Sequence, residues 1–187
     1  MAQPVVKYYT EQAYLALERS SYNKHEYYKG EIFAMGGATF KHSVIQVNLL
    51  VKLANHLSDK PGRTFGSGLR IHIPENSLYT YPDVVVVCDE PQFEDDSFDT
   101  LLNPAVLIEI LSPSTANYDK GAKFELYRDI PSLQEYILID SVTVHFVSYT
   151  RNTDGTWQLA ETRDIGGQLI ISHIGFQTSL SSIYDGT

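Results

Sequence analysis

Asp83 and Glu109 are the two residues whose types and surroundings point most directly to chemistry. Asp83 follows Pro82 and precedes four valines, and Glu109 interrupts the apolar segment 105–111. A continuous apolar run of this length, bounded by prolines, is typical of a strand buried on both faces. A carboxylate in such a strand is costly unless a cation neutralises it. Two such acids on neighbouring strands predict a site for a hard divalent cation, Mg²⁺ or Mn²⁺.

A third metal ligand and a lysine complete this hypothesis. The backbone carbonyl of Ile110 would add an oxygen beside the two carboxylates, and an ion held there activates water and stabilises charge on a phosphoryl group. Asp119, Lys123 and Tyr127 recur every fourth residue on a predicted helix, so they share one face. If that face packs toward the strand ends, Lys123 reaches the metal-bound water or the scissile phosphate.

The same residues also have purely structural interpretations. Asp83 alone fits an acid that caps the start of its strand, and Glu109 alone fits a buried ion pair with Arg70 or Lys123. Asp119 and Lys123 alone fit a surface pair on a helix, which is worth about 0.3–0.5 kcal/mol. The combination of these residues is more informative than any one of them.

Other candidates come from the N-terminal half. Glu31, at the start of a predicted strand, could supply a further acid, and Glu26 competes for that role; a solvent-facing strand acid is the alternative for both. His42, at the start of a predicted helix, could contact phosphate or assist proton transfer, or be a simple first-turn residue. Arg70 could offer a bidentate contact to phosphate or pair with the acids.

Composition bounds the class of protein. The 187 residues include 43% hydrophobic residues and show no repeat or linker, so we expect a single domain over residues 1–187 that buries roughly 70% of its unfolded surface. The one cysteine, Cys88, excludes an internal disulfide and fits a reducing compartment. No signal peptide and no apolar run of roughly 18 residues is found, so we expect a cytoplasmic protein with no membrane partner.

Net charge counts against a nucleic-acid partner. The formal charge is −9, whereas domains that bind nucleic acids usually carry a basic surface that neutralises phosphates. Acids that await a metal contribute to this total, and local potential matters more than the sum. The net charge therefore counts against DNA as a partner but does not exclude it.

The elements that must position these residues follow from periodicity and turn signals. Thr10 is a plausible N-cap for a helix at 11–19, a hairpin at 25–35 turns at Lys29-Gly30, and a second helix should run over 42–58. We expect strands 69–73 and 82–88 to pair as a hairpin joined by a polar connection, and 89–99 to be a solvated acidic loop. Further predicted elements are a strand at 105–111, a helix at 117–127, a strand at 135–140, and a β-meander at 142–149, 157–162 and 169–172.

Several of these segments resemble a known family. Asp83 after Pro82, with Glu109 inside a later hydrophobic strand, is similar to the PD-(D/E)xK nuclease signature. The chain more closely resembles the bacterial family of restriction-endonuclease-like proteins (Uma-type), over nearly its whole length. The segments that carry this resemblance are 81–86, 109–115, 119–127, 30–35 with His42 downstream, and 135–140.

The resemblance implies a restriction-endonuclease-like α/β (α+β) fold, with a mixed central sheet, flanking helices, a β-rich C-terminal part and an active site at one sheet end. It implies Mg²⁺-dependent (or Mn²⁺-dependent) hydrolysis of phosphodiester bonds of DNA, with Asp83 and Glu109 as metal ligands. Because an N-terminal acid is common among nucleases of this fold, Glu31 joins the expected catalytic set. The lysine expected two residues after the glutamate is Leu111 here, so its role passes to Lys123 on the next helix.

Two functions therefore remain open at this point. The first is a metal-dependent endonuclease, for which a homodimer would supply the two sites needed to cut both strands of a duplex. The second is a catalytically inactive nuclease-fold module that binds nucleic acid or protein. The charge of −9 and Leu111 motivate the second function, which predicts that Lys123 or Arg70 neutralises Glu109 in place of a metal.

Overall fold

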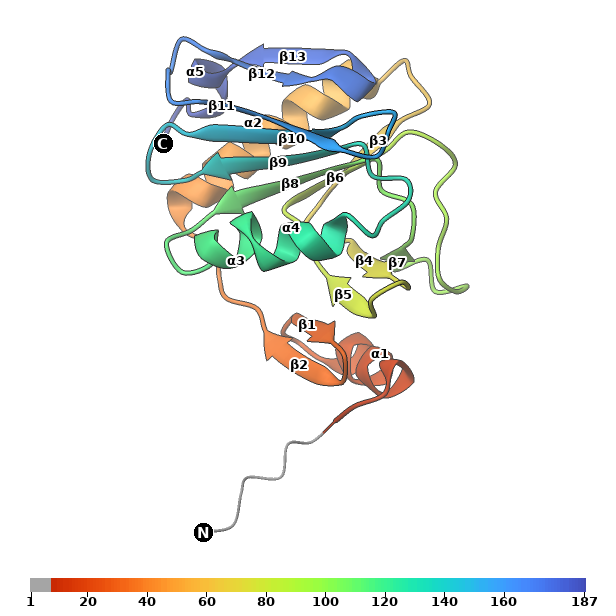
Figure 1. Ribbon diagram of the computed structural model, residues 1–187. Helices are drawn as coiled ribbons and strands as arrows, with labels where there is room; N and C mark the ends of the chain where they lie inside the picture. Colours follow the sequence, from red (N-terminus) through yellow and green to blue (C-terminus); the bar gives the residue numbers. More distant parts are fainter. Residues whose placement is uncertain (1–7) are drawn as a thin grey trace.

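The computed structural model describes residues 8–187, and a six-stranded sheet forms its centre (Figure 1). The strand order is β11-β10-β9-β8-β6-β3, and only β8 and β9 run parallel. The sheet is therefore mixed, as predicted. Its strands are β3 (Arg63–Gly66), β6 (Val84–Val87), β8 (Val106–Leu111), β9 (Glu135–Asp140), β10 (Phe146–Arg151) and β11 (Trp157–Thr162).

A second sheet has the order β2-β1-β5-β4-β7. The expected hairpin between 69–73 and 82–88 is wrong: β4 pairs with β5, which lies in the segment predicted to be a polar connection, whereas β6 pairs with β3 and β8. Four consecutive valines need burial on both faces, and the interior of the larger sheet, which has a core on each face, provides it. The strands are β1 (His25–Tyr28), β2 (Glu31–Ala34), β4 (Arg70–Ile73), β5 (Leu78–Thr80) and β7 (Thr100–Leu101).

The helices largely follow the predicted periodicity. Thr10 and Thr39 cap α1 and α2 through their side-chain oxygens. The helix predicted over 117–127 is divided at Gly121, whose φ of −114° and ψ of −94° are not helical. The helical segments are α1 (Glu11–Ser20), α2 (Phe40–Leu57), α3 (Ala116–Lys120), α4 (Ala122–Tyr127), the 3₁₀ turn η1 (Ser172–Ile174) and α5 (Leu180–Ile183).

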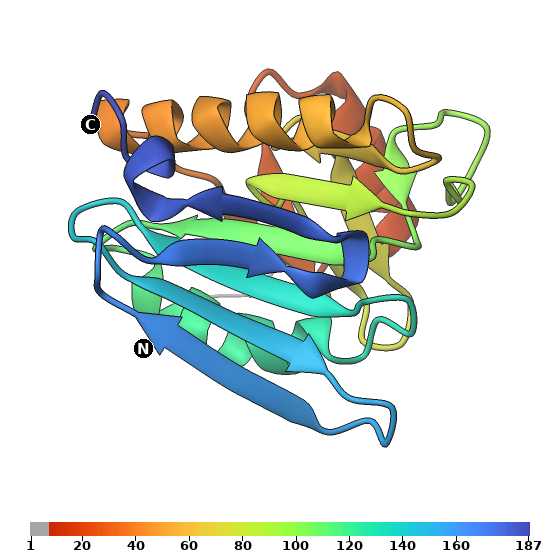
Figure 2. The same cartoon turned by 90° about the horizontal axis from the view of Figure 1, so that it is seen from above.

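The six-stranded sheet is covered on both faces, and Figure 2 shows α2 and the α3–α4 segment on opposite sides of it. On one face α2, β12 (Gln168–Ile171), β13 (Phe176–Ser179) and α5 form one core with the sheet. On the other face α4, β4 and β5 form a second core. The predicted meander ends at β11, because β12 pairs only with β13. Leu169 and Ile171 pack onto the sheet face instead of extending its edge.

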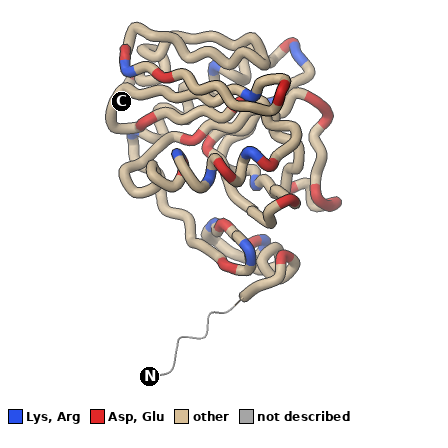
Figure 3. The backbone as a smooth tube through the Cα atoms, in the orientation of Figure 1, with Lys and Arg blue, Asp and Glu red and all other residues tan. Residues whose placement is uncertain are grey.

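The N-terminal elements are joined to the rest through the second sheet. Tyr27 of β1 is the register partner of Tyr79 of β5, and both rings pack against Tyr14 of α1. Arg19 of α1 also contacts Asp95 and Asp99, each at 2.8 Å. These contacts order part of the acidic segment 89–99, whose negative residues Figure 3 shows along the loop that follows β6. Across residues 8–187, no helix has the length and apolar character needed to cross a membrane.

Candidate active site

Asp83 and Glu109 lie at the same end of the central sheet. Strand β6 pairs with β8 so that Val84 lies opposite Ile108, and continuing this register by one residue places Asp83 opposite Glu109. The ladder ends there because Pro82, the next residue, has no N–H to donate. The backbone N–H of Ile110 instead donates to Oδ2 of Asp83 at 2.7 Å. The register and the proline therefore bring the two predicted acids together.

Glu109 is buried and is neutralised within the protein. Only 5% of the residue is exposed, and its Oε1 lies 2.9 Å from Nζ of Lys123. The hydroxyl of Tyr127 donates to the same oxygen at 2.7 Å. Tyr127 packs in the core cluster that includes Leu107 and Leu111 of β8. Glu109 therefore points to the face of the sheet that α4 covers.

Lys123 occupies the centre of an acidic cluster and is only 4% exposed. Its Nζ lies 3.3 Å from Oε1 of Glu26 and 3.6 Å from Oδ1 of Asp119, in addition to its contact with Glu109. Burial alone would lower the pKa of Lys123, but the surrounding carboxylates, led by Glu109, hold it well above its usual value. Lys123 is therefore a permanent cation at neutral pH. The helical face that was predicted from spacing does pack toward the strand ends.

The cluster holds more carboxyl groups than basic groups. Burial raises the pKa of Glu109, Lys123 opposes that shift, and the negative charges of Asp83 and Asp119 add to it. Burial likewise raises the pKa of Asp119. Three carboxyl groups, those of Glu26, Glu109 and Asp119, contact the one ammonium group of Lys123. A further cation would relieve this imbalance.

Glu26, and not Glu31, is the N-terminal acid that reaches the cluster. Glu26 contacts Lys123 and accepts a hydrogen bond from the buried hydroxyl of Thr80 on β5. Glu31 follows the hairpin turn directly and is exposed. Sequence reasoning named Glu26 only as a competitor. Its position deeper in the hairpin, farther from the Lys29-Gly30 turn, is the signal that favours it.

The first turns of α2 hold Asp83 from the other side. Nε2 of His42 lies 3.1 Å from Oδ2 of Asp83, and the side-chain amide of Gln46 donates to the backbone oxygen of Asp83 at 2.8 Å. Gln46 was missed by the sequence analysis, although it stands one helical turn after His42 and so shares its face. Within residues 8–187, the buried Nδ1 of His42 has no hydrogen-bond partner.

Arg70 does not belong to this cluster. Its guanidinium donates to the hydroxyls of Thr100 and Tyr81 and pairs with Asp99 at 3.0 Å. Arg70 therefore ties β4 to β7 and to the 89–99 segment. Of the two cations proposed as partners for Glu109, Lys123 is the one that contacts it.

The chemistry of the donor set fits a hard divalent cation, although its present arrangement does not form a metal cage. In the part of the chain that the structure describes, no three side chains among His, Cys, Asp and Glu are arranged to hold a metal ion. Glu26, Glu109 and Asp119 instead contact Nζ of Lys123. The carboxylate oxygens and the backbone oxygen of Ile110 are nevertheless the ligand types that Mg²⁺ and Mn²⁺ prefer.

Comparisons with known proteins agree with this architecture. A family described as "Uma2: Putative restriction endonuclease" matches residues 11–181. Two relatives from Synechocystis sp. are uncharacterized proteins. The match to slr1290 is 39% identical and covers 92% of this chain and 90% of that protein. The match to sll1609 is 38% identical and covers 86% of this chain and 91% of that protein.

A solved structure provides a second comparison. It is titled a "putative nuclease belonging to DUF820" from Anabaena variabilis, and it matches with a TM-score of 0.77 at 18% identity. The match covers 92% of this chain and 96% of that chain. The likeness shows a shared fold, and it confirms the predicted restriction-endonuclease-like α+β architecture.

Proposed function

The chain belongs to the Uma2 family, and from that premise we propose that it is a metal-dependent endonuclease that hydrolyses phosphodiester bonds of DNA. The observation that carries the proposal is the meeting of Asp83, Glu109 and Lys123 at one sheet end. The family description supports a nuclease-like activity. Metal dependence and DNA as the substrate rest on the chemistry of the site.

In this proposal Asp83, Glu109 and the backbone oxygen of Ile110 hold Mg²⁺ or Mn²⁺. The N–H and C=O groups of one strand residue point toward the same neighbouring strand, so the N–H bond from Ile110 to Asp83 places the Ile110 oxygen on the Asp83 side. When bound, the ion activates water and stabilises charge on the phosphoryl group.

The protein's own groups take complementary roles. Lys123 stays protonated, so it stabilises the negative charge of the phosphate and does not act as a general base. His42 and Gln46 fix the orientation of Asp83. Glu26 replaces Glu31 as the N-terminal acid of the site, because Glu26 contacts Lys123.

The test is cleavage of supercoiled and single-stranded DNA in Mg²⁺ or Mn²⁺. We expect the wild type to cut, and Asp83→Asn and Glu109→Gln, which keep side-chain volume but remove charge, to fall to background. Glu26→Gln should lower the rate, whereas Glu31→Gln should retain it. Thermal unfolding of each variant checks that the fold is intact. Cutting by Asp83→Asn at the wild-type rate would rule out this site.

One observation favours the second function, a nuclease-fold module that binds without cutting. Lys123 already neutralises part of the charge on Glu109 at 2.9 Å, as that function requires. Calorimetry with Mn²⁺ separates the two functions. Binding that is lost in Asp83→Asn supports the nuclease, and the absence of binding together with the absence of cleavage supports the module.

A further inference from the structure

Two exposed aromatic side chains border the acidic cluster and have no role in the proposed hydrolysis. Phe33 of β2 is 47% exposed and Tyr118 of α3 is 39% exposed. Single exposed apolar residues are common on protein surfaces. These two are distinctive because both lie next to the acidic cluster. Phe33 is the strand-register partner of Glu26, and the ring of Tyr118 lies beside Lys123.

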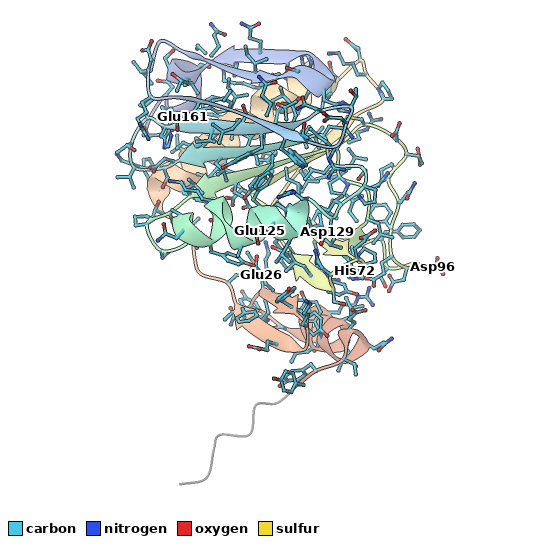
Figure 4. The ribbon with its side chains drawn as sticks, viewed as in Figure 1. Glu26, His72, Asp96, Glu125, Asp129 and Glu161 are labelled. Atoms are coloured by element: carbon cyan, nitrogen blue, oxygen red, sulfur yellow. The ribbon has the colours of Figure 1, made fainter. Side chains whose placement is uncertain are left out.

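Phe33 shares a sheet face with Glu26. The two residues are direct register partners in the β1–β2 hairpin, and partners in an antiparallel pair project their side chains to the same face. The opposite face carries Tyr27 and Ile32, which pack against α1. Because Glu26 reaches Lys123, the face with Phe33 is the one that looks toward α4. Figure 4 shows Glu26 between the hairpin and the α3–α4 segment.

Tyr118 reaches the cluster from the other side. It directly precedes Asp119 in α3, and the centroid of its ring lies 5.8 Å from Nζ of Lys123. Burial, followed by the negative charge of Glu26, raises the pKa of Tyr118 to about 12, so its hydroxyl stays protonated. Phe33, through its register with Glu26, and Tyr118, through its approach to Lys123, therefore lie beside the same cluster on two different elements.

We propose that Phe33 and Tyr118 stack unpaired nucleobases beside the scissile phosphate, and that the substrate is single-stranded or locally unpaired DNA. This inference rests on the proposed nuclease function. Aromatic rings accept any base by stacking, and truncating one stacking ring typically weakens binding between about five- and 150-fold. A base that is already unpaired reaches such a ring at the lowest cost.

The electrostatics of the chain favour the same substrate. With a net charge of −9, the protein offers little counter-charge to the two phosphate strands of a duplex. Lys123, the cation of the site, is only 4% exposed. Stacking does not depend on phosphate neutralisation, so it supplies affinity that the surface charge does not.

The experiment measures binding of fluorescent 12-nucleotide DNA, single-stranded or as a duplex of the same sequence, by anisotropy in the presence of a chelator. We expect the wild type to bind the single strand at least about tenfold more tightly than the duplex. Phe33→Leu and Tyr118→Leu should weaken single-strand binding at least about fivefold and leave duplex binding unchanged. Tyr118→Phe, which keeps the ring, should bind as the wild type does.

A matched control is Tyr22→Leu, which removes an aromatic ring that is 102% exposed in the loop after α1. It should not change binding of either DNA. Equal binding of both DNAs, or losses that are the same in Tyr22→Leu as in the two test variants, would overturn the inference. The Asp83-dependent cleavage test would still support the nuclease in that case. Conversely, ring-dependent single-strand binding without cleavage would support this inference and count against the nuclease.

Discussion

Lys123 controls the charge balance of the site at the scale of single residues. Three carboxylates lie within 3.6 Å of its Nζ, and a fourth, Asp83, adds to the shift of Glu109. A buried ion pair gains little over an apolar pair, but removing one partner leaves a charge without compensation in a medium of low dielectric constant. Lys123 is therefore needed for folding as well as for the proposed chemistry.

Lys123→Met should destabilise the protein in a pH-dependent manner. We expect a loss of about 3–5 kcal/mol near pH 10, where Glu109 of the wild type is ionised, which is the usual cost of breaking a buried pair. Without Lys123 the pKa of Glu109, already raised by burial, rises further. Between its unfolded-state value of about 4.3 and its folded value, the folded state then binds a proton that the unfolded state releases, so the free energy of unfolding falls as pH rises.

Urea unfolding from pH 5 to pH 10 in the presence of a chelator measures this effect. Lys120→Met is the matched control, because Lys120 is exposed on the preceding helix, and its change should stay within about 0.5 kcal/mol. Because the pKa of Glu109 is about 8 when Lys123 is present, the curves of the wild type and Lys123→Met should fall together up to that pH, and above it only the curve of Lys123→Met should continue to fall. Parallel curves for the two proteins would show that Lys123 does not compensate Glu109.

At the scale of elements, the site is built where separate segments end. The start of β6, the end of β8, the first turns of α2 and the buried face of α4 each contribute one or two side chains. Strand β1 is joined to this assembly by its pairing with β5 and by the contact of Glu26 with Lys123. The hairpin that contains β1 therefore determines whether Glu26 lies beside Lys123.

This architecture explains what the sequence could and could not predict. Apolar runs and helical spacing predicted β6, β8, α2 and the helical segment 117–127, and with them the elements that carry Asp83, Glu109 and Lys123. Strand pairing depends on which surfaces meet in three dimensions, so the partners of β4 and β6 were predicted wrongly. The same limit applied to the N-terminal acid, because the docking of the β1–β2 hairpin decides that Glu26 contacts Lys123 while Glu31 is exposed.

Gly30→Ala tests the hairpin. Lys29 and Gly30 have φ of 46° and 94°, as both central residues of a type I′ turn require. A Cβ on Gly30 would also lie 2.7 Å from Cδ1 of Tyr8. We therefore expect Gly30→Ala to lower stability by about 1–2 kcal/mol and to reduce any Glu26-dependent cleavage.

Lys29→Asn is the companion variant for this turn. Asparagine tolerates positive φ and gives the Asn-Gly pair that such turns favour, so its stability should equal or exceed that of the wild type. Thermal unfolding of both variants measures the difference, and hydrogen exchange at β1 locates it. A Gly30→Ala protein as stable as Lys29→Asn would mean that the turn is not constrained as described.

At the scale of the whole molecule, the proposed function requires an acidic protein to bind a polyanion. The expected homodimer would be needed to cut both strands of a duplex, and it stays a prediction. A single-stranded substrate needs only one site and few phosphate contacts. The acidic net charge of the protein therefore favours a single-stranded substrate, and the salt dependence of DNA binding tests this link.

The salt dependence of single-strand binding should be shallow. The logarithm of the binding constant falls with the logarithm of salt concentration by about 0.7 for each phosphate neutralised on a single strand. With Lys123 as the site's cation, surrounded by carboxylates, we expect a slope of about −1. Affinity should then fall only about fourfold between 50 and 200 mM salt, against the roughly 10³-fold or greater loss of proteins with many phosphate contacts. Anisotropy titrations at several salt concentrations measure the slope. A slope steeper than about −4 would reveal a phosphate-binding surface and would contradict an affinity based on stacking.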